Sequence, residues 1–412
     1  MDEEILVSVS AGATRVALLA GGVIQELHVE RADRRSLVGN LYSGRVQRIV
    51  PGMDGAFIDI GIGVNGFLAA ADLPAPGAIG DQLCAGQSLL VQVTRDALGD
   101  KGPRLTCAIT LASRYLVLAT AGARGTVSRR IGPDTERQRL RQLLPGLVAE
   151  LELGRAGLIA RTAAANVSAE VLRADASRLA ARWRQLRTGA AQAAAPHLVL
   201  AEPPLPLRVL RDSAGAGVPR IVVDAASCAA EIRAWCAEDL ALAAPVEEEC
   251  AEPGSLFRRR GVEAEISAAL AAVVPLPSGG NMVIERTQAM TTVDVNTGSS
   301  IGHSDLEQTL LQTNLEAAAA LPRQLRLRAL GGIVVVDFID LRESGHWRSV
   351  LLALKQALAS DPDAGPVTDV GKLGLAILTR RQTRPPLAEV LLVPCPECAG
   401  SGRVARPAAG GL

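Results

Sequence analysis

Short alternating segments fill the first quarter of the chain. Hydrophobic and polar residues alternate in EILVSVS, TRVALLA and GGVIQELHVE, within residues 3–30. Alternation with a period of two is typical of strands with one buried face, and the Gly21–Gly22 pair suits a tight turn. About five more short strands, broken by glycine, follow from Leu37 to Cys107, and they predict a small closed barrel of the OB type.

Helical periodicity replaces alternation beyond residue 110. TERQRLRQLL and AEVLRADASRLAARWRQLRTGAA predict amphipathic helices on either side of a strand, AGLIART. A boundary follows at Pro203, Pro204 and Pro206. Beyond it, residues 208–270 predict a strand, a helix, an acidic loop and a further helix.

The last third of the chain predicts an α/β arrangement. Residues 281–296 predict a strand pair, and a helix is expected from about Asp305 to Leu330. The apolar run GGIVVVDFIDL is typical of a central strand buried on both faces. A helix near 346–359, a strand near 374–378 and a short tail complete a multidomain α+β and α/β protein without internal repeats.

Charge is balanced overall but unevenly distributed. The 43 basic and 43 acidic residues give a formal net charge of zero. Nucleic-acid binders often have a basic pI, and this chain does not. Residues 114–187 nevertheless hold fourteen arginines and six acids, whereas residues 224–252 hold eight acids and only Arg233. This asymmetry indicates either a basic binding face or two solvated surfaces of opposite sign.

The cysteines and the N-terminus indicate the compartment. Seven mostly scattered cysteines do not form a disulfide framework, which fits a reducing environment. The N-terminal MDEEILVSVS is acidic and lacks the long apolar core of a signal peptide. No run approaches the roughly 18 apolar residues of a membrane span, so we expect a soluble cytoplasmic protein.

Three polar residues in the α/β half are candidates for metal chemistry. Asp294 and Asn296 are two apart in a predicted strand and should share a face, and Asp337 ends the apolar run, where open α/β sheets place their sites. Carboxylate and amide oxygens are ligands that magnesium accepts. Asp340 would face the other way if the strand continued, and is interpreted as a supporting or alternative ligand. Capping of strands or helices explains any single aspartate equally well, and spacing alone does not join Asp294 to Asp337.

Long motifs in the same region resemble one family. The segments LPSGGNMVIERTQAMTTVDVNTG, QTNLEAA and RQLRLRALGGIVVVDFIDL closely resemble the catalytic core of the ribonuclease E/G family. The resemblance implies that Asp294 and Asp337 hold Mg²⁺ and that Asn296 is a catalytic polar neighbour. It further implies an endoribonuclease that cuts single-stranded, A/U-rich RNA during rRNA processing and mRNA decay, leaving a 5′-phosphate on the downstream product.

The predicted barrel is similar to the family's RNA-binding OB domain. In NLYSGRVQRIVPGMDGAFIDIGIGVNGFL, Phe57 and Phe67 match the aromatic pair on which RNA bases stack. Alternation alone instead favours the barrel core for Phe57. Lys101 and Arg104 follow the last loop and are expected to meet phosphates.

The arginine-rich segment resembles the family's pocket for a 5′-monophosphate. GLIARTAA stands where the family has GLIVRTAG, and a guanidinium beside a hydroxyl suits a terminal phosphate. The expected pocket residues are Arg161, Thr162, Val117, Arg129 and Arg130. Ala164 replaces a glycine-like position and is predicted to tighten the pocket floor. The alternative interpretation of Arg161 is a surface salt bridge.

The tail reads CPECAGSGR, with Cys395 and Cys398. Such a CxxC is half of a zinc site or a redox pair, and a structural zinc needs four ligands. The resemblance implies that two chains share one Zn²⁺ and form a homodimer. The sequence ends 14 residues after Cys398, without the family's small C-terminal domain or long tail. It therefore looks closer to ribonuclease G, or to a shortened relative, than to ribonuclease E.

The resemblance also predicts the domain organisation. It implies an RNase H-like and DNase I-like α/β core with an inserted OB-fold β-barrel and a 5′-sensor subdomain. The expected parts are an RNase H-like subdomain at 1–35 and 204–270, the OB-fold domain at 36–107, the 5′-monophosphate sensor at 108–203, the DNase I-like catalytic domain at 271–391 and the zinc-link tail at 392–412. The alternatives are a non-catalytic RNA-binding regulator, whose mark would be lost metal ligands, and a less favoured DNA nuclease.

Overall fold

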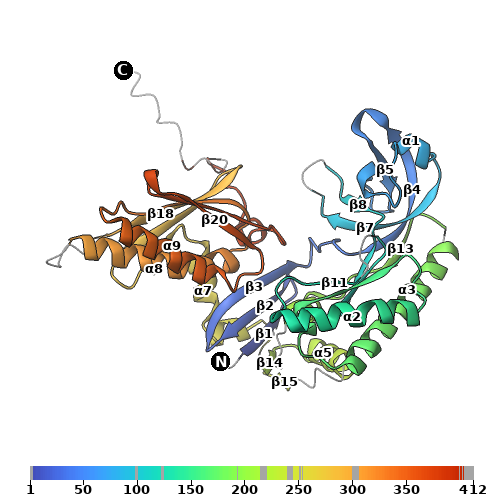
Figure 1. The fold of residues 1–412 in the computed structure, drawn as a ribbon, viewed down its shortest axis with the longest axis horizontal. Helices are drawn as coiled ribbons and strands as arrows, with labels where there is room; N and C mark the ends of the chain where they lie inside the picture. The colour runs from blue at the N-terminus through green and yellow to red at the C-terminus, as the bar shows by residue number, and fades with distance from the viewer. Residues whose placement is uncertain are drawn as a thin grey trace. The chain divides into compact units, whose positions relative to one another are not determined.

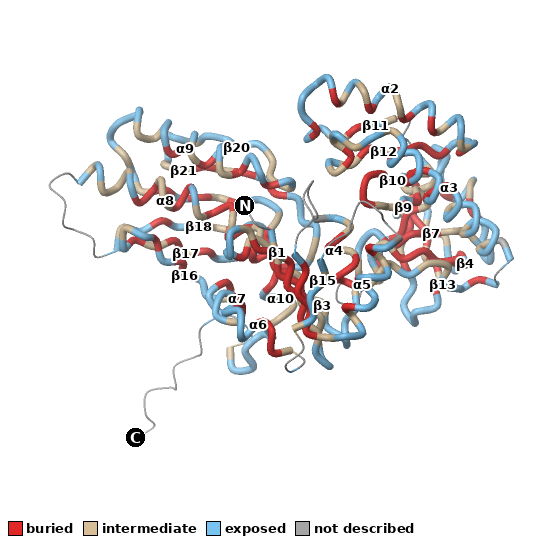
Figure 2. Tube along the Cα trace, turned by 90° about the horizontal axis from the view of Figure 1, so that it is seen from below, coloured by how far each residue is buried: buried red, intermediate tan, exposed pale blue. Residues whose placement is uncertain are grey.

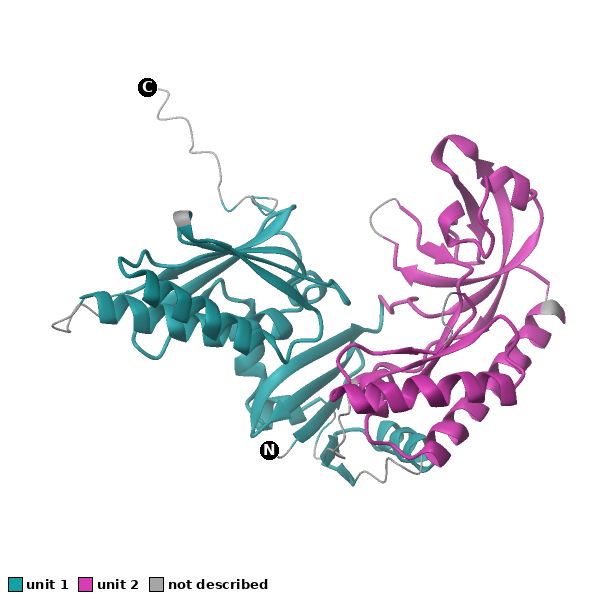
Figure 3. Cartoon of the chain, viewed as in Figure 1, with its two compact units in different colours: residues 1–33, 219–412 teal, residues 34–218 magenta. Residues whose placement is uncertain are grey.

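The chain folds into two compact units with separate sheets and cores. The computed structural model describes residues 3–97, 101–121, 125–192, 194–213, 220–238, 245–249, 252, 254–298, 306–398, 400 and 402 (Figure 1). Unit 1 comprises residues 1–33 and 219–412, and unit 2 comprises residues 34–218 (Figure 3). The mixed α/β architecture agrees with the predicted fold class.

A five-stranded sheet begins unit 1. The alternating N-terminal segments form an antiparallel meander of β1 (Glu3–Val9), β2 (Ala13–Ala20) and β3 (Val23–Arg31). Gly21 and Gly22 adopt φ of +56° and +77° in the β2–β3 turn, a conformation that glycine tolerates best. The predicted strands and turn are confirmed.

The 208–270 segment supplies the rest of this sheet and its helices. Parallel strands extend the sheet in the order β15-β14-β1-β2-β3. The added elements are β14 (Arg220–Val223), β15 (Val246–Glu248), α5 (Ala226–Glu238), α6 (Leu256–Arg259) and α7 (Val262–Leu270). The acidic stretch therefore contains the strand β15, which was not predicted. Its residues 239–244, 250 and 251 lie outside the described residues.

A six-stranded sheet and two long helices form the second half of unit 1. The strand order is β16-β17-β18-β19-β21-β20. Its elements are β16 (Val273–Pro275), β17 (Asn281–Arg286), β18 (Met290–Asn296), α8 (Leu306–Leu327), β19 (Gly332–Asp337), α9 (Ser344–Leu358), β20 (Ala364–Val370), β21 (Leu375–Arg380) and the short α10 (Leu387–Leu391). The predicted strand pair, helices and later strand are confirmed. Parallel pairing of β18 and β19 brings their carboxyl ends to the same edge.

The two faces of this sheet differ. Helices α8 and α9 run along one face and bury Val293, Val334 and Val336 against Leu321 and Leu354 (Figures 1 and 2). On the opposite face Ile333 remains 43% exposed. The prediction that β19 is buried on both faces is therefore wrong, although the strand is central. β-Branched residues favour an extended backbone whether or not both faces are covered, so composition overstated the burial.

Unit 2 opens with a closed five-stranded barrel, as predicted. Its strands are β4 (Leu41–Val50), β5 (Gly55–Asp59), β6 (Gly66–Ala69), β7 (Ser88–Arg95) and β8 (Arg104–Thr106), with the short α1 (Ile79–Gln82) between β6 and β7. Pairing of β4 with β7 closes the barrel, and β13 (His197–Leu200) pairs with β4. Val46, Ile58 and Leu68 fill its interior.

A second, small sheet completes unit 2. Its order is β11-β12-β10-β9, formed by β9 (Thr110–Ala112), β10 (Leu116–Ala119), β11 (Thr126–Val127) and β12 (Gly157–Ala160). The predicted helices α2 (Asp134–Glu150) and α3 (Ala169–Gln192) pack on one face. Residues Leu205–Ser213 form a helix, α4, that was not predicted, and the strand expected in the 208–270 segment is β14. Among the described helices of both units, none is long and apolar enough to cross a membrane.

Candidate active site and phosphate pocket

Two carboxylates lie side by side at the carboxyl ends of β18 and β19. The parallel register pairs Asp294 with Asp337, and both side chains are exposed. Alternation places Asn296 on the same face, where its Nδ2 donates to Asp294 Oδ2 at 2.8 Å. The structure thus brings together the three residues that spacing alone could not join.

The electrostatics of this pair suit a cation. Burial, followed by repulsion from Asp294 and Asp340, raises the pKa of Asp337 above its usual range. Among the described residues there is no group of three or more His, Cys, Asp or Glu residues arranged to hold a metal. Magnesium, however, commonly takes one or two protein carboxylates and keeps several waters. Two carboxylates and an amide on an open sheet face fit that ion.

Asp340 returns toward the pair because β19 ends at Asp337. The side chain of Asn314, fully buried in α8, donates to the carbonyl of Ile339 at 2.8 Å and accepts from its amide at 3.0 Å. These bonds hold the turn that follows the strand. The condition under which Asp340 would face away, a continuing strand, is therefore not met, and its charge reaches Asp337.

Helix α8 holds this loop at a second point. Glu307 accepts from the backbone amides of Arg342 at 3.0 Å and Glu343 at 3.2 Å, and lies 3.2 Å from His346 Nδ1. Burial would raise the pKa of Glu307, but these hydrogen bonds lower it overall. Sequence reasoning assigned no role to Glu307 or Asn314, although Asn314 belongs to the quoted QTNLEAA motif.

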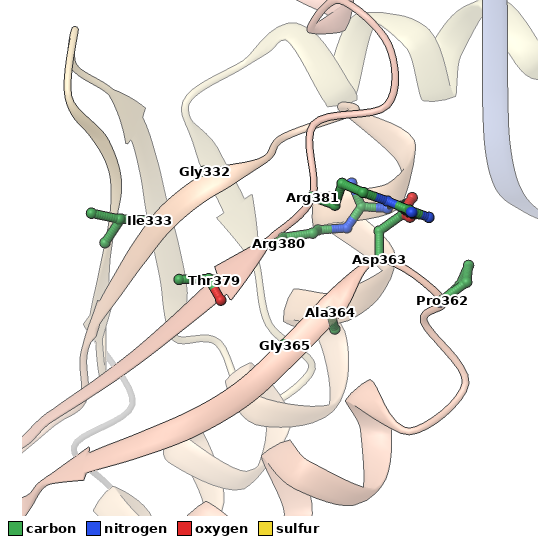
Figure 4. Close-up of a pocket in the computed structure, with 9 residues that line it drawn as sticks. All are labelled: Gly332, Ile333, Pro362, Asp363, Ala364, Gly365, Thr379, Arg380 and Arg381. Carbon is green, nitrogen blue, oxygen red and sulfur yellow. Dashed lines mark hydrogen bonds and ion pairs between the residues drawn. The ribbon is translucent and has the colours of Figure 1, made fainter. Parts of the chain in front are cut away.

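A hollow of about 520 Å³ at the other end of β19 is separate from the carboxylate pair (Figure 4). Its walls include Ile333, near the start of β19, which lies about 13 Å along the strand from Asp337 at roughly 3.3 Å per residue. Its arginines are already paired: Arg380 Nε lies 2.9 Å from Asp361 Oδ2, and Arg381 Nη2 lies 2.7 Å from Asp363 Oδ1. The hollow therefore does not extend the candidate metal site.

Phe57 and Phe67 form an edge-to-face pair on the outside of the barrel. They are direct partners in the β5–β6 register, with ring centres 5.7 Å apart and planes at 67°. Their neighbours Ala56, Ile58 and Leu68 are fully buried inside the barrel, whereas both rings are only partly buried. The core interpretation that alternation favoured for Phe57 is wrong.

Arginines extend this pair into a row across the barrel. Arg48 pairs with Phe57 and places its guanidinium carbon 5.5 Å from the ring centre, while Arg104 pairs with Phe67. Arg95 in turn pairs with Arg104. Lys101 is exposed just before β8, and residues 98–100 lie outside the described residues. Rings flanked by cations are what stacking on bases and contact with phosphates require.

The predicted phosphate-pocket residues cluster on the small sheet of unit 2. Val117 lies on the face turned away from α2 and α3, and Arg161 directly follows β12. Thr162 Oγ1 lies 3.2 Å from Ser128 Oγ, which the sequence analysis did not identify. Exposed Arg129 follows Ser128.

Two expectations about this pocket change. Arg161 Nη2 donates to Asp212 Oδ1 at 2.7 Å, so the salt bridge considered as an alternative exists within the cluster. The methyl group of Ala164 is fully buried in the core beneath the sheet. It does not tighten the pocket floor as predicted.

Of the two tail cysteines, Cys395 is exposed and Cys398 is partly buried. Residues 399, 401 and 403–412 of the predicted zinc-link tail lie outside the described residues.

Comparisons with known proteins identify the family. A model of the ribonuclease E/G family matches residues 110–383. Ribonuclease G of Salmonella typhimurium (strain SL1344) and of Escherichia coli (strain K12) are each 41% identical to this chain, over 98% of its length and 85% of theirs. Ribonuclease E of Escherichia coli (strain K12) is 35% identical over 95% of this chain and 38% of its own length. The chain therefore belongs to the ribonuclease E/G family.

Proposed function

We propose that this protein is a magnesium-dependent endoribonuclease that cuts single-stranded RNA and is stimulated by a 5′-monophosphate. Its ribonuclease G and ribonuclease E relatives support the endoribonuclease assignment. The observation that carries the proposed chemistry is the direct pairing of Asp294 with Asp337 on the open face of the six-stranded sheet.

Asp294 and Asp337 would hold the metal ion, and Asn296 would contact the scissile phosphate or a metal-bound water. Bound magnesium supplies a Lewis acid and lowers the pKa of a coordinated water. The bond from Asn296 to Asp294 orients the exposed amide, which keeps an oxygen acceptor and a second N–H donor besides that bond. The carboxylates thus set the position of the ion, and Asn296 sets the approach of the RNA.

The two surfaces of unit 2 are proposed to select the substrate. Bases would stack on Phe57 and Phe67, while Lys101 and the arginines of the row contact phosphates. Such stacking requires unpaired bases and tolerates any sequence, so a preference for A/U-rich RNA follows from its weaker pairing. Arg161 and Thr162 would bind the 5′-phosphate, with Val117 against the first base and Arg129 nearby.

We assign the five-stranded sheet of unit 1 to an RNase H-like subdomain and the six-stranded sheet to a DNase I-like catalytic domain, with the barrel and the 5′ sensor inserted in the sequence of the former, between β3 and β14. Cytoplasmic RNA processing and decay is the role that fits. A non-catalytic RNA-binding regulator is the second candidate, but both carboxylates and Asn296 are retained and assembled.

Cys395 and Cys398 are proposed to share one Zn²⁺ with the same pair of a second chain, because a closed zinc site needs four ligands. The double variant Cys395→Ser, Cys398→Ser should lose zinc and become monomeric. Metal analysis combined with light scattering should find one zinc per two wild-type chains. One zinc per chain, or a dimeric double variant, would contradict the shared site, and a reversible disulfide without metal would favour a redox pair.

The central test uses one single-stranded RNA prepared with a 5′-monophosphate or a 5′-hydroxyl. Purified full-length protein should cut both in magnesium and neither in EDTA, and it should cut the monophosphorylated RNA faster. Cleavage in EDTA would refute the metal assignment. Binding without any cleavage under either condition would favour the regulator.

A further inference from the structure

The guanidinium of Arg161 is held by two separate segments of unit 2. Its Nη1 donates to the carbonyl of Ser113 at 2.6 Å, and its Nη2 donates to Asp212 Oδ1 at 2.7 Å. Ser113 lies between β9 and β10, and Asp212 lies near the end of α4. The Arg161 side chain is only 21% exposed. Its planar donor group is therefore fixed in orientation before any ligand arrives.

Asp212 belongs to a chain of alternating charges. Arg211 bonds both of its carboxylate oxygens at 3.0 Å and donates from Nη1 to Glu202 Oε2 at 2.9 Å. Glu202, Arg211, Asp212 and Arg161 together carry no net formal charge. Burial would raise the pKa of Asp212, but Arg211 and Arg161 lower it overall, so the carboxylate remains ionised.

One edge of the Arg161 guanidinium remains open to a ligand. Within the part of unit 2 that the structure describes, Nε has no acceptor, and Nη2 has one N–H beyond the bond to Asp212. Two adjacent N–H groups match two oxygens of a phosphate. The hydroxyls of Thr162 and Ser128 stand beside the residue. A phosphate can therefore bind Arg161 while Asp212 stays in place.

RNA presents two kinds of phosphate to such a site. Each internal phosphodiester carries one negative charge, whereas a terminal monophosphate carries about −1.5 to −2 at pH 7. An arginine without a counter-ion attracts any phosphodiester of the strand. A neighbouring carboxylate weakens the attraction for both kinds of phosphate in proportion, so the singly charged phosphodiester is the first to bind too weakly to occupy the site, while a ligand of about twice the charge can still bind.

We propose that Asp212 lowers the affinity of Arg161 for phosphate so far that only a doubly charged terminal phosphate occupies the sensor. By partly neutralising Arg161, it keeps the singly charged internal phosphodiesters from occupying the pocket. This inference rests on the proposed function, since it requires Arg161 to bind the 5′-phosphate. Asp212 acts through Arg161 and does not touch the RNA.

The test measures binding of full-length protein, in EDTA, to one single-stranded RNA with three different 5′ ends. The ends are a hydroxyl, a monophosphate and a methyl phosphate, which places a single negative charge where the monophosphate has two. Wild type should bind the monophosphate most tightly and should not distinguish the methyl phosphate from the hydroxyl. Arg161→Ala should bind all three alike.

Asp212→Asn keeps an oxygen acceptor for both arginines and removes the charge. We expect this variant to bind the methyl-phosphate RNA about threefold or more tighter than the hydroxyl RNA, the scale of one exposed ion pair. Its log–log salt dependence for that RNA should steepen by about 0.7, because one more phosphate is contacted. Glu150→Gln is the matched control, since it makes the same charge change at the exposed Arg173–Glu150 pair, 3.2 Å apart, and should alter neither quantity.

Each other outcome overturns the proposal. If the Asp212→Asn variant binds the methyl-phosphate RNA no more tightly than the hydroxyl RNA, the charge of Asp212 does not set selectivity. If Asp212→Asn only weakens binding of the monophosphate RNA, the role of Asp212 is limited to orienting Arg161. If wild type binds all three RNAs alike and Arg161→Ala changes nothing, the sensor assignment itself fails. Circular dichroism checks folding, and Asp212→Ser is the second variant if Asp212→Asn does not fold.

Discussion

The carboxylate pair of unit 1, Asp294 and Asp337, and the Arg161–Asp212 pair of unit 2 differ in how their charges are balanced. Asp294 and Asp337 lie together, and their repulsion, with that of Asp340, contributes to the raised pKa of Asp337. Arg161, in contrast, already has a carboxylate partner in Asp212. No ion pair offsets Asp294 or Asp337 within the described ranges of the chain, whereas Glu202, Arg211, Asp212 and Arg161 balance one another.

This difference separates two tasks that charged residues perform. An uncompensated pair attracts an ion, because the ion relieves the repulsion. A compensated arginine attracts anions weakly, so only a strongly charged anion is expected to occupy it. In the proposed function, the charged pair of unit 1 is accordingly the place for chemistry, and the balanced cluster of unit 2 is the place for selection.

The largest effect should come from removing one charge of the uncompensated pair. Asp294→Asn or Asp337→Asn keeps the shape but weakens the hold on magnesium, whose contribution of several kcal/mol corresponds to a loss of cleavage rate of about 10³-fold or more. RNA binding should persist. Asp363→Asn, at the far end of the same sheet, is the control and should cut at the normal rate. Near-normal cleavage by either site variant would remove the distinction between the two regions.

The second effect concerns the compensated arginine. Arg161→Ala should lower the ratio of cleavage rates for 5′-monophosphorylated over 5′-hydroxylated RNA by about tenfold or more, since a charged hydrogen bond contributes roughly 1.5–3 kcal/mol. Initial rates on the two RNAs measure this ratio. An equal loss on both substrates would assign Arg161 to folding of the small sheet.

The third prediction concerns the aromatic rings on the outside of the barrel. They carry no charge, and the expected effect of removing one is smaller than that of either charge change above. Phe67→Ala should weaken single-stranded RNA binding about fivefold or more, because stacking contributes about 1–3 kcal/mol per base. The melting temperature should change little, and Phe57→Ala should behave similarly. If the ring instead contributed to the core, its removal would destabilise the fold by about 3–5 kcal/mol. Calorimetry beside binding titration distinguishes the two roles.

The smallest effects should have opposite signs in the two regions. The raised pKa of Asp337 means that its ionisation opposes folding, a penalty absent below the pKa of the unfolded chain and acquired as pH rises. The lowered pKa of Asp212 means a stabilisation present above the unfolded pKa and lost as pH falls.

In EDTA at about pH 7, Asp337→Asn should therefore raise the melting temperature and Asp212→Asn should lower it, each by on the order of 1 °C because both groups are partly exposed. The Asp337 difference should vanish once the pH falls below the usual aspartate pKa, whereas the Asp212 difference should persist to lower pH because the pKa of Asp212 is lowered in the folded protein. Shifts of the same sign would contradict the charge comparison.

The sequence predicted the elements of the molecule better than the contacts between them. Long periodic segments such as α3 and α8, and the strand pair β17–β18, were predictable because each carries its own pattern. The strands β9, β10 and β11 were not, since they are two to four residues long. Parallel pairing of β18 with β19, which unites the carboxylates, depends on a crossover that spacing does not encode.

The partners of the site residues were harder still to predict. Asp212 is 51 positions from Arg161 and lies on a helix, α4, that was not predicted. Arg48 meets Phe57 only because the β4–β5 register shifts between Val46 and Arg48, a bulge that interrupts the alternation. Family resemblance supplied residues such as Phe67 and Arg161, but it gave no information about the charges around them.

The register in which β18 pairs with β19 also decides whether the sheet can fold. A slip by one residue would turn Asp337 toward the apolar layer beneath α8 and α9 and would move Val334 and Val336 into water. Burying an unpaired carboxylate is prohibitive beside the marginal stability of a folded domain. Chains in the wrong register are therefore left unfolded, rather than accumulating as well-folded but inactive protein. Every molecule that completes its sheet has, by the same event, placed its two aspartates together.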